Sequence, residues 1–423
     1  MAYYDHVHST INVVAVGGGA PTQISATPGS NFTIFTEEKA VLVWTHLDAA
    51  NVGTLVVWTA DDGLHTLSTT SLSPQAAVDA SSTYVVYETS VNEASSTGNV
   101  VGSRTDGSGG VTLVTGATTP GFILAGNYAV VNYALGTELY TQSFALETWA
   151  STVITTSTVA GTQTLEGVDS AGTKVLVLDP SNSLNVFPIA GSTATLIASG
   201  VTTATLGASA MFAPTGAEVY FAGGGGATLD KSVSTASAVD VLANGTNLSL
   251  YGLAPNLSSM IAYGGGTPAS NVYFQPTSGL APLAVLTPAM GFGGALYTND
   301  SSHVLFFSDY SEVTGIGSLH SLATAAGTSS LIDASFATVG AYGASKAVLT
   351  DNVTTTTADL KVFDAASTAA PTLIAASVQS FTASATVPTV GWGFAFMPES
   401  TSVVYFATAQ AGRVAGIYVT ALP

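Results

Sequence analysis

The chain has 423 residues, only 8% of them charged, and 26 Asp and Glu against seven Lys and Arg give a formal net charge of −19. This composition argues against nucleic acid or anionic lipid as a partner, because both need a clustered basic surface. The chain has no cysteine, which excludes disulfides, thiolate metal sites and a cysteine nucleophile.

Short runs of β-branched and aromatic residues recur along the chain, and we predict that each forms a strand. The runs lie at residues 41–44, 84–87, 129–133, 175–178, 218–221, 260–263, 304–307, 347–350 and 403–406. Their spacing is close to 43 residues, apart from a longer gap before the last run. A steady period of this length indicates repeated supersecondary units.

The residues around each run complete the repeated unit. A strand of small residues and then a polar turn precede most runs, as at 210–212 and 213–216. An alternating strand and a fourth apolar strand follow, as at 55–58 and 64–67. Four short strands in a repeat of this length predict one blade of a β-propeller. A transmembrane barrel or a β-helix fits less well, because many strands are apolar on both faces and the repeat is long.

The two ends of the chain each supply part of a blade. Residues 11–16 and 21–25 have the pattern of third and fourth strands, whereas 392–396 and 403–406 have that of first and second strands; residues 416–420 are a further candidate for the third. We predict an all-β chain with one propeller domain over 1–423 and nine four-stranded blades. Segments 1–28 and 380–423 share the closing blade, which leaves no free edge. Eight blades remain the alternative if residues 120–158 do not form one, and which terminus supplies the closing strand stays open.

A family resemblance follows from the turns of the repeats. The segment 212–221, Phe-Ala-Pro-Thr-Gly-Ala-Glu-Val-Tyr-Phe, resembles the turn and second strand of the TolB-like propeller family, whose repeats also form the propeller domain of prolyl oligopeptidases. Residues 254–256 and 397–400 match the same turn in part. The resemblance implies a propeller over nearly the whole chain and a role as a binding platform, often in the bacterial cell envelope.

The motifs of common enzyme classes are missing from the sequence. It contains neither the Gly-x-Ser-x-Gly of α/β-hydrolases nor a phosphate-binding loop, so we predict no catalytic site and no cofactor. Asp79, Glu166 and Asp169 are candidate carboxylates for glycan hydrolysis, although solvated turn residues are the simpler interpretation. His6 and His8 would share one face of a strand, but a third ligand is not identifiable and we predict no metal site.

Three aromatic residues form the predicted ligand site. Tyr297, Tyr342 and Trp392 fall on first strands of consecutive repeats, nearest the central channel of a propeller. Their rings could stack on a sugar or a peptide there. The alternative is that they fill the space between blades.

These observations predict a non-enzymatic binding or scaffold propeller that recognises a protein or glycan at a rim or at the channel mouth. The abundance of Ser, Thr and Gly with few Lys and Arg favours an exported or cell-surface location, although residues 1–6 lack the features of a signal peptide. One alternative is a self-assembling subunit of a surface layer, fibre or appendage. Another is a carboxylate-dependent glycan hydrolase or lyase. We predict no nucleic-acid partner and no membrane insertion.

Overall fold

The computed structural model describes most of the chain as strands joined by turns. The described residues are 2–5, 8, 10–14, 20–26, 32–37, 39–92, 94–191, 193–201, 203–204, 206–236, 239–265, 271–311, 314–352, 357–367, 369–381, 391–392, 394–396, 402–407 and 416–422. These residues contain no helix. The chain divides into two compact units: the first comprises Met1–Thr203, Ser209–Gly224 and Lys231–Val239, and the second comprises Ala204–Ala208, Gly225–Asp230 and Asp240–Pro423.

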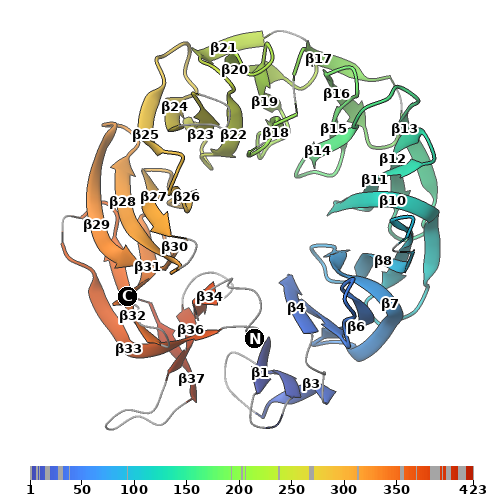
Figure 1. The fold of residues 1–423 in the computed structure, drawn as a ribbon, viewed down its shortest axis with the longest axis horizontal. Helices are drawn as coiled ribbons and strands as arrows, with labels where there is room; N and C mark the ends of the chain where they lie inside the picture. Colours follow the sequence, from blue (N-terminus) through green and yellow to red (C-terminus); the bar gives the residue numbers. More distant parts are fainter. Residues whose placement is uncertain are drawn as a thin grey trace. The chain divides into compact units, whose positions relative to one another are not determined.

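The first unit contains an antiparallel sheet of ten strands, ordered from β13 to β4 (Figure 1). The strands are β4 (Phe32–Glu37), β5 (Ala40–Thr45), β6 (Val52–Thr59), β7 (Gly63–Val78), β8 (Tyr84–Asn92), β9 (Thr97–Arg104), β10 (Val111–Ala125), β11 (Tyr128–Leu135), β12 (Glu138–Ala145) and β13 (Ser151–Ser157). Strand β7 pairs with β6 along its first half and with β8 along its second half. Strand β10 joins β9 and β11 in the same way. The sheet is therefore three four-stranded modules linked by shared strands.

Smaller sheets flank this one along the chain. The first is three-stranded, with β1 (Ala2–Asp5), β2 (Thr10–Val13) and β3 (Thr22–Ala26). After the ten-stranded sheet come β14 (Thr164–Val168), β15 (Lys174–Leu178), β16 (Ser183–Pro188) and β17 (Thr195–Ser199) as one four-stranded sheet. The next sheet, of β18 (Ala210–Phe212), β19 (Glu218–Gly223), β20 (Thr228–Val233) and β21 (Val239–Asn244), is divided between the two units.

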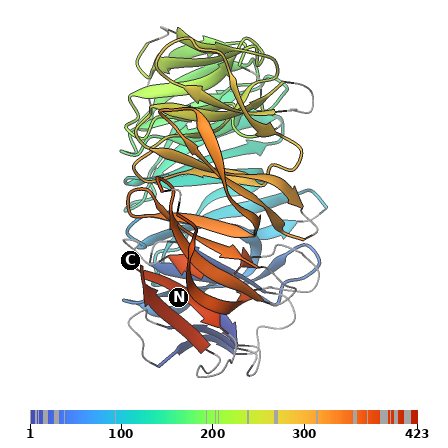
Figure 2. The ribbon, with the colours of Figure 1, turned by 90° about the vertical axis from the view of Figure 1, so that its left-hand side faces the viewer.

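The second unit continues the same arrangement. One sheet has β22 (Ser249–Leu253), β23 (Ser259–Gly264), β24 (Asn271–Pro276) and β25 (Ala284–Pro288), and the next has β26 (Gly294–Tyr297), β27 (His303–Ser311), β28 (Ile316–Ala323) and β29 (Thr328–Phe336). Figure 2 shows the orange strands of this unit as twisted ribbons. The last sheet contains β30 (Thr338–Tyr342), β31 (Lys346–Asp351), β32 (Thr357–Asp364), β33 (Thr372–Phe381), β35 (Phe394–Phe396), β36 (Ser402–Ala407) and β37 (Gly416–Ala421), with β34 (Gly391–Trp392) paired to β33.

Burial along the strands follows their place in the module. The third strand β6 alternates between half-buried and fully buried residues, so only one of its faces is fully covered. The second strands β5 and β15 are buried along nearly their whole length. A strand covered on both faces must be apolar throughout, which explains the uninterrupted Val and Leu runs of the sequence.

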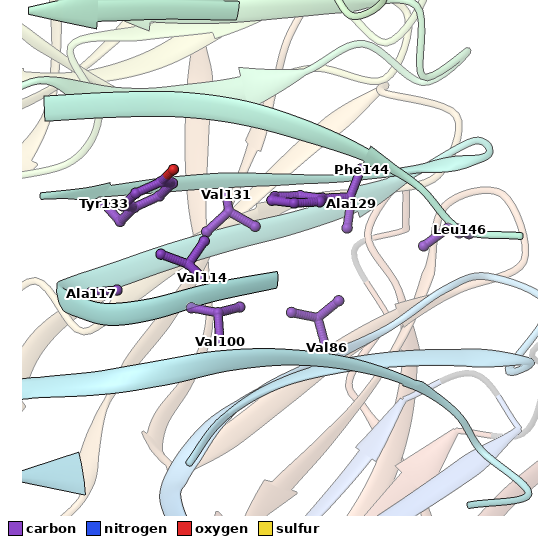
Figure 3. Close-up of a cluster of buried hydrophobic side chains, with 9 residues drawn as sticks. All are labelled: Val86, Val100, Val114, Ala117, Ala129, Val131, Tyr133, Phe144 and Leu146. Carbon is purple, nitrogen blue, oxygen red and sulfur yellow. The ribbon is translucent and has the colours of Figure 1, made fainter. Parts of the chain in front are cut away.

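The core lies between the faces of successive modules. Figure 3 shows one cluster in the first unit, where buried side chains from β8, β9, β10, β11 and β12 point toward one another. Val86, Val100 and Val131 have no exposed surface in this cluster. Since a buried Val or Leu contributes about 1.5–3 kcal/mol, such layers are the main source of stability of the fold.

Polar turns also join some modules to the next. The bonded residues are 43 to 45 positions apart, which is one repeat. The backbone N–H of Lys39 donates to Ser82 Oγ, Ser170 Oγ donates to the carbonyl of Pro214, the N–H of Asn256 donates to Ser301 Oγ, and Asn299 Nδ2 donates to the carbonyl of Gly343. The short polar residues of the turns thus have a packing role as well as a conformational one.

The prediction of an all-β chain built from repeated four-stranded antiparallel units is confirmed. All nine predicted second strands are present, as β5, β8, β11, β15, β19, β23, β27, β31 and β36. The segment 120–158, which was the weakest repeat of the sequence, contributes to the four strands β10 to β13. Residues 416–420 lie in β37 beside β36, which is the third-strand place. The N-terminal segments form β2 and β3, and residues 15–19 lie outside the described residues.

None of the described residues forms a helix long and apolar enough to cross a membrane.

Candidate functional site

A pocket of about 380 Å³ opens on the ten-stranded sheet of the first unit. It is lined by residues from the β5–β6 loop, from the middle of β7, from β8, from the β8–β9 turn and from the middle of β10. These residues are Ala50, Leu72, Gln75, Glu88, Val91, Ser96 and Pro120. The walls are mostly aliphatic, and one ionisable side chain lies among them.

Local chain geometry forms the rim of the pocket. Asp48 Oδ1 accepts hydrogen bonds from the backbone N–H groups of Ala50 (2.9 Å) and Val52 (2.8 Å), which closes a tight turn. The N–H of Ser73 donates to the carbonyl of Asn51 at 2.8 Å and ties this turn to β7. The pairing of β7 with β8 then shifts register between Ser71 and Ala76. This irregularity makes room for the pocket, as bulges commonly do beside functional sites.

Glu88 is the ionisable residue of the pocket. Its side chain is 4% exposed. Its backbone position is fixed, because Ser71 Oγ donates to the Glu88 carbonyl at 2.9 Å and Trp44 Nε1 donates to Ser71 Oγ at 3.1 Å. Within the described part of the chain, no hydrogen bond or ion pair reaches the carboxyl group itself. The carboxyl oxygens are not among the fully buried polar atoms that lack a partner, so solvent in the open pocket reaches them.

Gly98 provides the space that the Glu88 side chain occupies. A Cβ at this position of β9 would overlap Glu88 Oε1 and would lie 2.9 Å from Glu88 Cγ. The residue opposite Gly98 on β10 is Ala117, which is small and fully buried. Two small residues on neighbouring strands therefore accommodate a carboxyl in a layer that otherwise contains Val, Leu and Phe.

Burial raises the pKa of Glu88 to about 7, because the low-dielectric surroundings disfavour the charged form. The titratable groups on the packed elements do not offset this effect. Tyr87 is on the opposite face of β8 and donates to the Leu67 carbonyl at 3.0 Å, and Arg104 lies over the ring of Tyr84 at the other end of the strand. The group therefore exchanges its proton near neutral pH.

The predicted aromatic site lies in the second unit, and packing accounts for two of its three side chains. Tyr297 is partly buried against a cluster that includes Ile261, and it accepts a hydrogen bond from Ser259 Oγ at 3.3 Å. Burial raises the pKa of Tyr297. Tyr342 is 3% exposed and belongs to a different cluster. Trp392 pairs through β34 with β33, and its side chain lies outside the described residues. A binding role for these residues stays a prediction.

The three candidate carboxylates are engaged by backbone groups. Asp79 accepts bonds from the N–H groups of Thr83 and Tyr84, and Asp169 accepts bonds from Thr173 and Lys174. These are turn contacts, as the simpler interpretation expects.

Glu166 Oε2 accepts a bond from the N–H of Ala210 at 3.3 Å and so joins β14 to β18. Burial raises the pKa of Glu166, and the backbone bonds from Ala210 and Ser209 counteract part of that rise.

A serine and a histidine also meet in the second unit. Ser308 Oγ lies 2.9 Å from His320 Nε2, which resembles the contact between a nucleophile and its base. The nearby Asp309 accepts a bond from Ser308 and not from the imidazole. His320 instead stacks on Phe306, with ring centroids 5.0 Å apart, and burial lowers its pKa. In the described part of the chain no side chain hydrogen-bonds the other ring nitrogen of His320, so the pair lacks there the arrangement of a catalytic triad.

Glu88 was not among the residues predicted to be functional. The residue directly follows the apolar run 84–87, where a polar residue indicates the end of a strand. One signal in the sequence could have identified it. Side chains alternate between the two faces of a strand, so residue 88 lies on the same face as Val86, which is buried. Among the described residues, no group of three potential metal ligands is found.

Comparisons with known proteins support the fold alone. No protein-family model matches the sequence, and no curated protein matches it either. A crystal structure described as that of the eukaryotic initiation factor shares 11% identity over 88% of this chain and 92% of that one, with a TM-score of 0.55. A putative TolB from Agrobacterium tumefaciens shares 16% identity over 54% of this chain and 85% of its own, with a TM-score of 0.31. The structures similar to this chain include TolB-like and other propeller-type folds, and the likeness is one of fold only.

Proposed function

We propose that this chain is a non-enzymatic binding propeller that holds its ligand in the pocket around Glu88. The proposal includes the expected setting of the protein, an exported or cell-surface location with a protein or a glycan as partner. The absence of catalysis is part of the proposal, and it is supported by the candidate carboxylates Asp79, Glu166 and Asp169, which accept hydrogen bonds from backbone groups.

One observation carries this proposal. Glu88 is 96% buried, faces a cavity of about 380 Å³, and has no partner for its carboxyl among the described residues. Partial desolvation without a partner disfavours the charged form of this carboxyl. A ligand that satisfies the carboxyl would offset this cost, and pockets of this size with a few polar groups are common small-ligand sites.

Filling the pocket tests the proposal. Ala50→Phe places a ring at the rim, where only the backbone of Ala50 makes a local hydrogen bond. We expect at least tenfold weaker binding of any protein or glycan that the wild-type chain retains on an array of envelope proteins and glycans. Ala80→Phe is the matched control, because Ala80 is exposed in the turn before β8 and does not line the pocket. Equal binding by both variants would exclude the pocket as the ligand site.

The proposed architecture is a closed ring of nine blades. The described residues contain three four-stranded modules in the ten-stranded sheet and five more from β14 to β33. Strands β35, β36 and β37 fill the first three places of a further blade, which leaves the fourth place for the N-terminal segment. Among the described residues, β1 to β3 pair only with one another. The shared closing blade is therefore part of the proposal.

A second candidate function is self-assembly, and a separate observation favours it. The outermost strand of every four-stranded module carries at least one exposed aliphatic residue. These residues are Leu64, Val111, Val153, Leu196, Val239, Val241, Val285, Leu331 and Leu373, and they are between 40% and 61% exposed. Strands β17 and β25 also have an unpaired edge in the described part of the chain and no charged residue. Such edges favour pairing between chains.

Light scattering at increasing protein concentration tests this second function. We expect ordered oligomers for the wild type and a shift toward monomer for the double variant Val285→Lys and Leu331→Lys. Ser330→Lys on the same strand as Leu331 is the control, because it adds an exposed charge without removing an aliphatic side chain. A wild-type chain that stays monomeric at all concentrations rejects self-assembly and leaves the binding proposal intact.

A further inference from the structure

The pocket around Glu88 combines three features that together specify a class of ligand. It has one mostly buried carboxyl, aliphatic walls from Leu72, Val91 and Pro120, and no positively charged side chain among its described lining residues. We infer that this pocket binds an alkylammonium group, either a lysine side chain of a partner protein or a free primary amine. The inference rests on the proposed function, and it names the ligand chemistry of the same site.

The missing counter-charge is the first argument. His46, in the β5–β6 loop, lies 3.2 Å from Thr45 Oγ1 through its Nδ1 and is not a lining residue of the pocket. Strands β7 to β10 contain two further groups that can carry a positive charge, His65 and Arg104. His65 lies against the carbonyl of Asp62, and Arg104 pairs with Asp106 at 3.7 Å. Neither residue lines the pocket. A buried carboxylate is stabilised by an opposite charge within about 4–6 Å, so the cation that completes this site has to come from outside.

The shape of the carboxyl environment favours an ammonium over a guanidinium group. Glu88 Oε1 is the carboxyl atom nearest to the position that a Gly98 Cβ would take, so this oxygen is packed against β9. Oε2 is not among the three atoms nearest to that position, and we take it as the oxygen available to a ligand. A guanidinium binds carboxylates best through two parallel hydrogen bonds, whereas an ammonium is a compact charge that one oxygen can accept.

The walls of the pocket and the charge of the protein support the same class. Leu72, Val91 and Pro120 provide aliphatic surface for the methylene groups of a lysine-like stem, which normally lie along apolar surface behind the charged end. Gln75 and Ser96, both exposed on the rim, offer polar oxygens to the remaining ammonium protons. A net charge of −19 also raises the local concentration of cations and repels anions.

Binding of this kind is coupled to a proton. In the free protein below pH 7 the Glu88 carboxyl is protonated, and it must ionise to pair with RNH₃⁺. The balanced step is Glu88–COOH + RNH₃⁺ → Glu88–COO⁻···RNH₃⁺ + H⁺, with the proton released to solvent. Affinity therefore increases with pH, by roughly tenfold for each pH unit up to about 7, and becomes independent of pH above it.

The groups around Glu88 do not produce the same pH dependence. Tyr87 is on the opposite face of β8, and burial raises its pKa above its usual value near 10. Asp48 is the carboxylate of the neighbouring turn and accepts two backbone hydrogen bonds. His65 and Arg104 face the other end of the strands. Glu88 is thus the group whose ionisation a bound cation would change between pH 5 and 8.

Calorimetric titration with n-butylammonium chloride tests the inference. Titrations at pH 6 in two buffers of different ionisation enthalpy measure how many protons are released for each ligand that binds. We expect close to one proton released per ligand at pH 6 and almost none at pH 8.5. Neutral n-butanol should bind without proton release, and n-propylguanidinium should bind more weakly than n-butylammonium. N-acetyl-lysine methylamide distinguishes a lysine side chain of a partner protein from a free primary amine as the ligand. It binds only if the pocket mouth admits a peptide backbone.

Two variants and a control locate the effect. Glu88→Gln keeps the shape of the side chain and should weaken n-butylammonium binding at pH 8 at least tenfold. Gly98→Ala should also weaken it by displacing the carboxyl without removing it. Glu147→Gln makes the same charge change at an exposed position of the same unit and should leave binding unchanged. A thermal melt of each variant verifies that it is folded.

Each outcome decides between the two proposals. Equal binding of n-butylammonium to the wild type and Glu88→Gln, or binding without proton release at pH 6, overturns the inference. If n-butylammonium does not bind but Ala50→Phe still weakens retention of an array ligand, the pocket is a binding site for other chemistry and only the inference fails. If neither effect is seen, both proposals fail.

Discussion

Glu88 shows how one residue can combine a cost to folding with a capacity for binding. Its carboxyl has a pKa near 7 in the folded chain and a value near 4.5 when solvated. Between these values the folded state holds a proton that the unfolded state has lost, so stability falls as pH rises from about 4.5 to 7. The protonated carboxyl is accommodated in its apolar layer, and the ionised one is not.

We therefore expect Glu88→Gln to stabilise the protein at pH 8 by about 2–3 kcal/mol relative to the wild type, which is the scale of a pKa shift of this size. At pH 3 the difference should be close to zero, because Glu88 is then almost fully protonated in both the folded and the unfolded chain. Urea unfolding of both proteins at the two pH values measures the difference. Glu147→Gln should show no such pH dependence, and a Glu88→Gln variant less stable than the wild type at pH 8 would contradict our account of the buried carboxyl.

Tyr342 permits a second test at this scale. The side chain lies in a cluster with Val348 and Leu360, both without exposed surface. If packing is its main role, Tyr342→Ala should lower the free energy of unfolding by about 3–5 kcal/mol, as for other large buried rings. Denaturant unfolding of the variant and of the wild type measures this difference in the free energy of unfolding. A loss below about 1 kcal/mol would instead favour the predicted role of this tyrosine in ligand binding.

At the scale of elements, the turns before the second strands fit against one another. The Asp169 turn of the sheet β14–β17 lies next to Gly216 in the following turn, where a Cβ would lie 2.6 Å from Asp169 Cβ. Gly216 also has a φ of +66°. Both constraints act on one residue, so the position requires glycine.

Gly216→Ala should lower the free energy of unfolding by more than 2 kcal/mol, because the added Cβ meets a neighbouring module in addition to the backbone strain. Gly63→Ala is the matched control, with a φ of +77° and no atom within 4 Å of the new Cβ. Gly63→Ala should lower the free energy of unfolding only by the amount that the left-handed backbone conformation costs an alanine, about 1–2 kcal/mol. Thermal melts of the two variants compare them, and equal losses would show that contact between turns contributes nothing.

The sequence was sufficient to predict the repeated elements. Runs such as 175–178 are apolar on both faces because sheets cover both, and this burial is visible in the residue types themselves. The continuity of β7 was not predictable, because Ser71, Ser73 and Pro74 resemble a turn and yet lie within one long strand. The pocket was missed for a related reason. The pocket depends on a register shift in β7 and on Gly98 in β9. Neither feature can be recognised from the residues of β8, the strand that carries Glu88.

At the scale of the whole molecule, the proposed closing blade makes the N-terminal segment a structural part of the fold. Deletion of residues 1–28 should then expose an edge in that blade and remove the pairing that joins the termini. We expect a lower melting temperature together with aggregation, measured by calorimetry and light scattering. A truncated protein that melts like the full chain and stays monomeric would exclude the shared blade.

The continuous strands β7 and β10 have a consequence for how the molecule opens. Because each of them continues from one module into the next, opening one module displaces a strand whose other half is hydrogen-bonded in the next. The sheets β14–β17 and β22–β25 are separate and can open individually. Native-state amide exchange should therefore give β5, β8 and β11 one common opening free energy, whereas β15 and β23 each exchange with their own. In this chain the size of a cooperative folding unit is determined by whether a strand continues past its module.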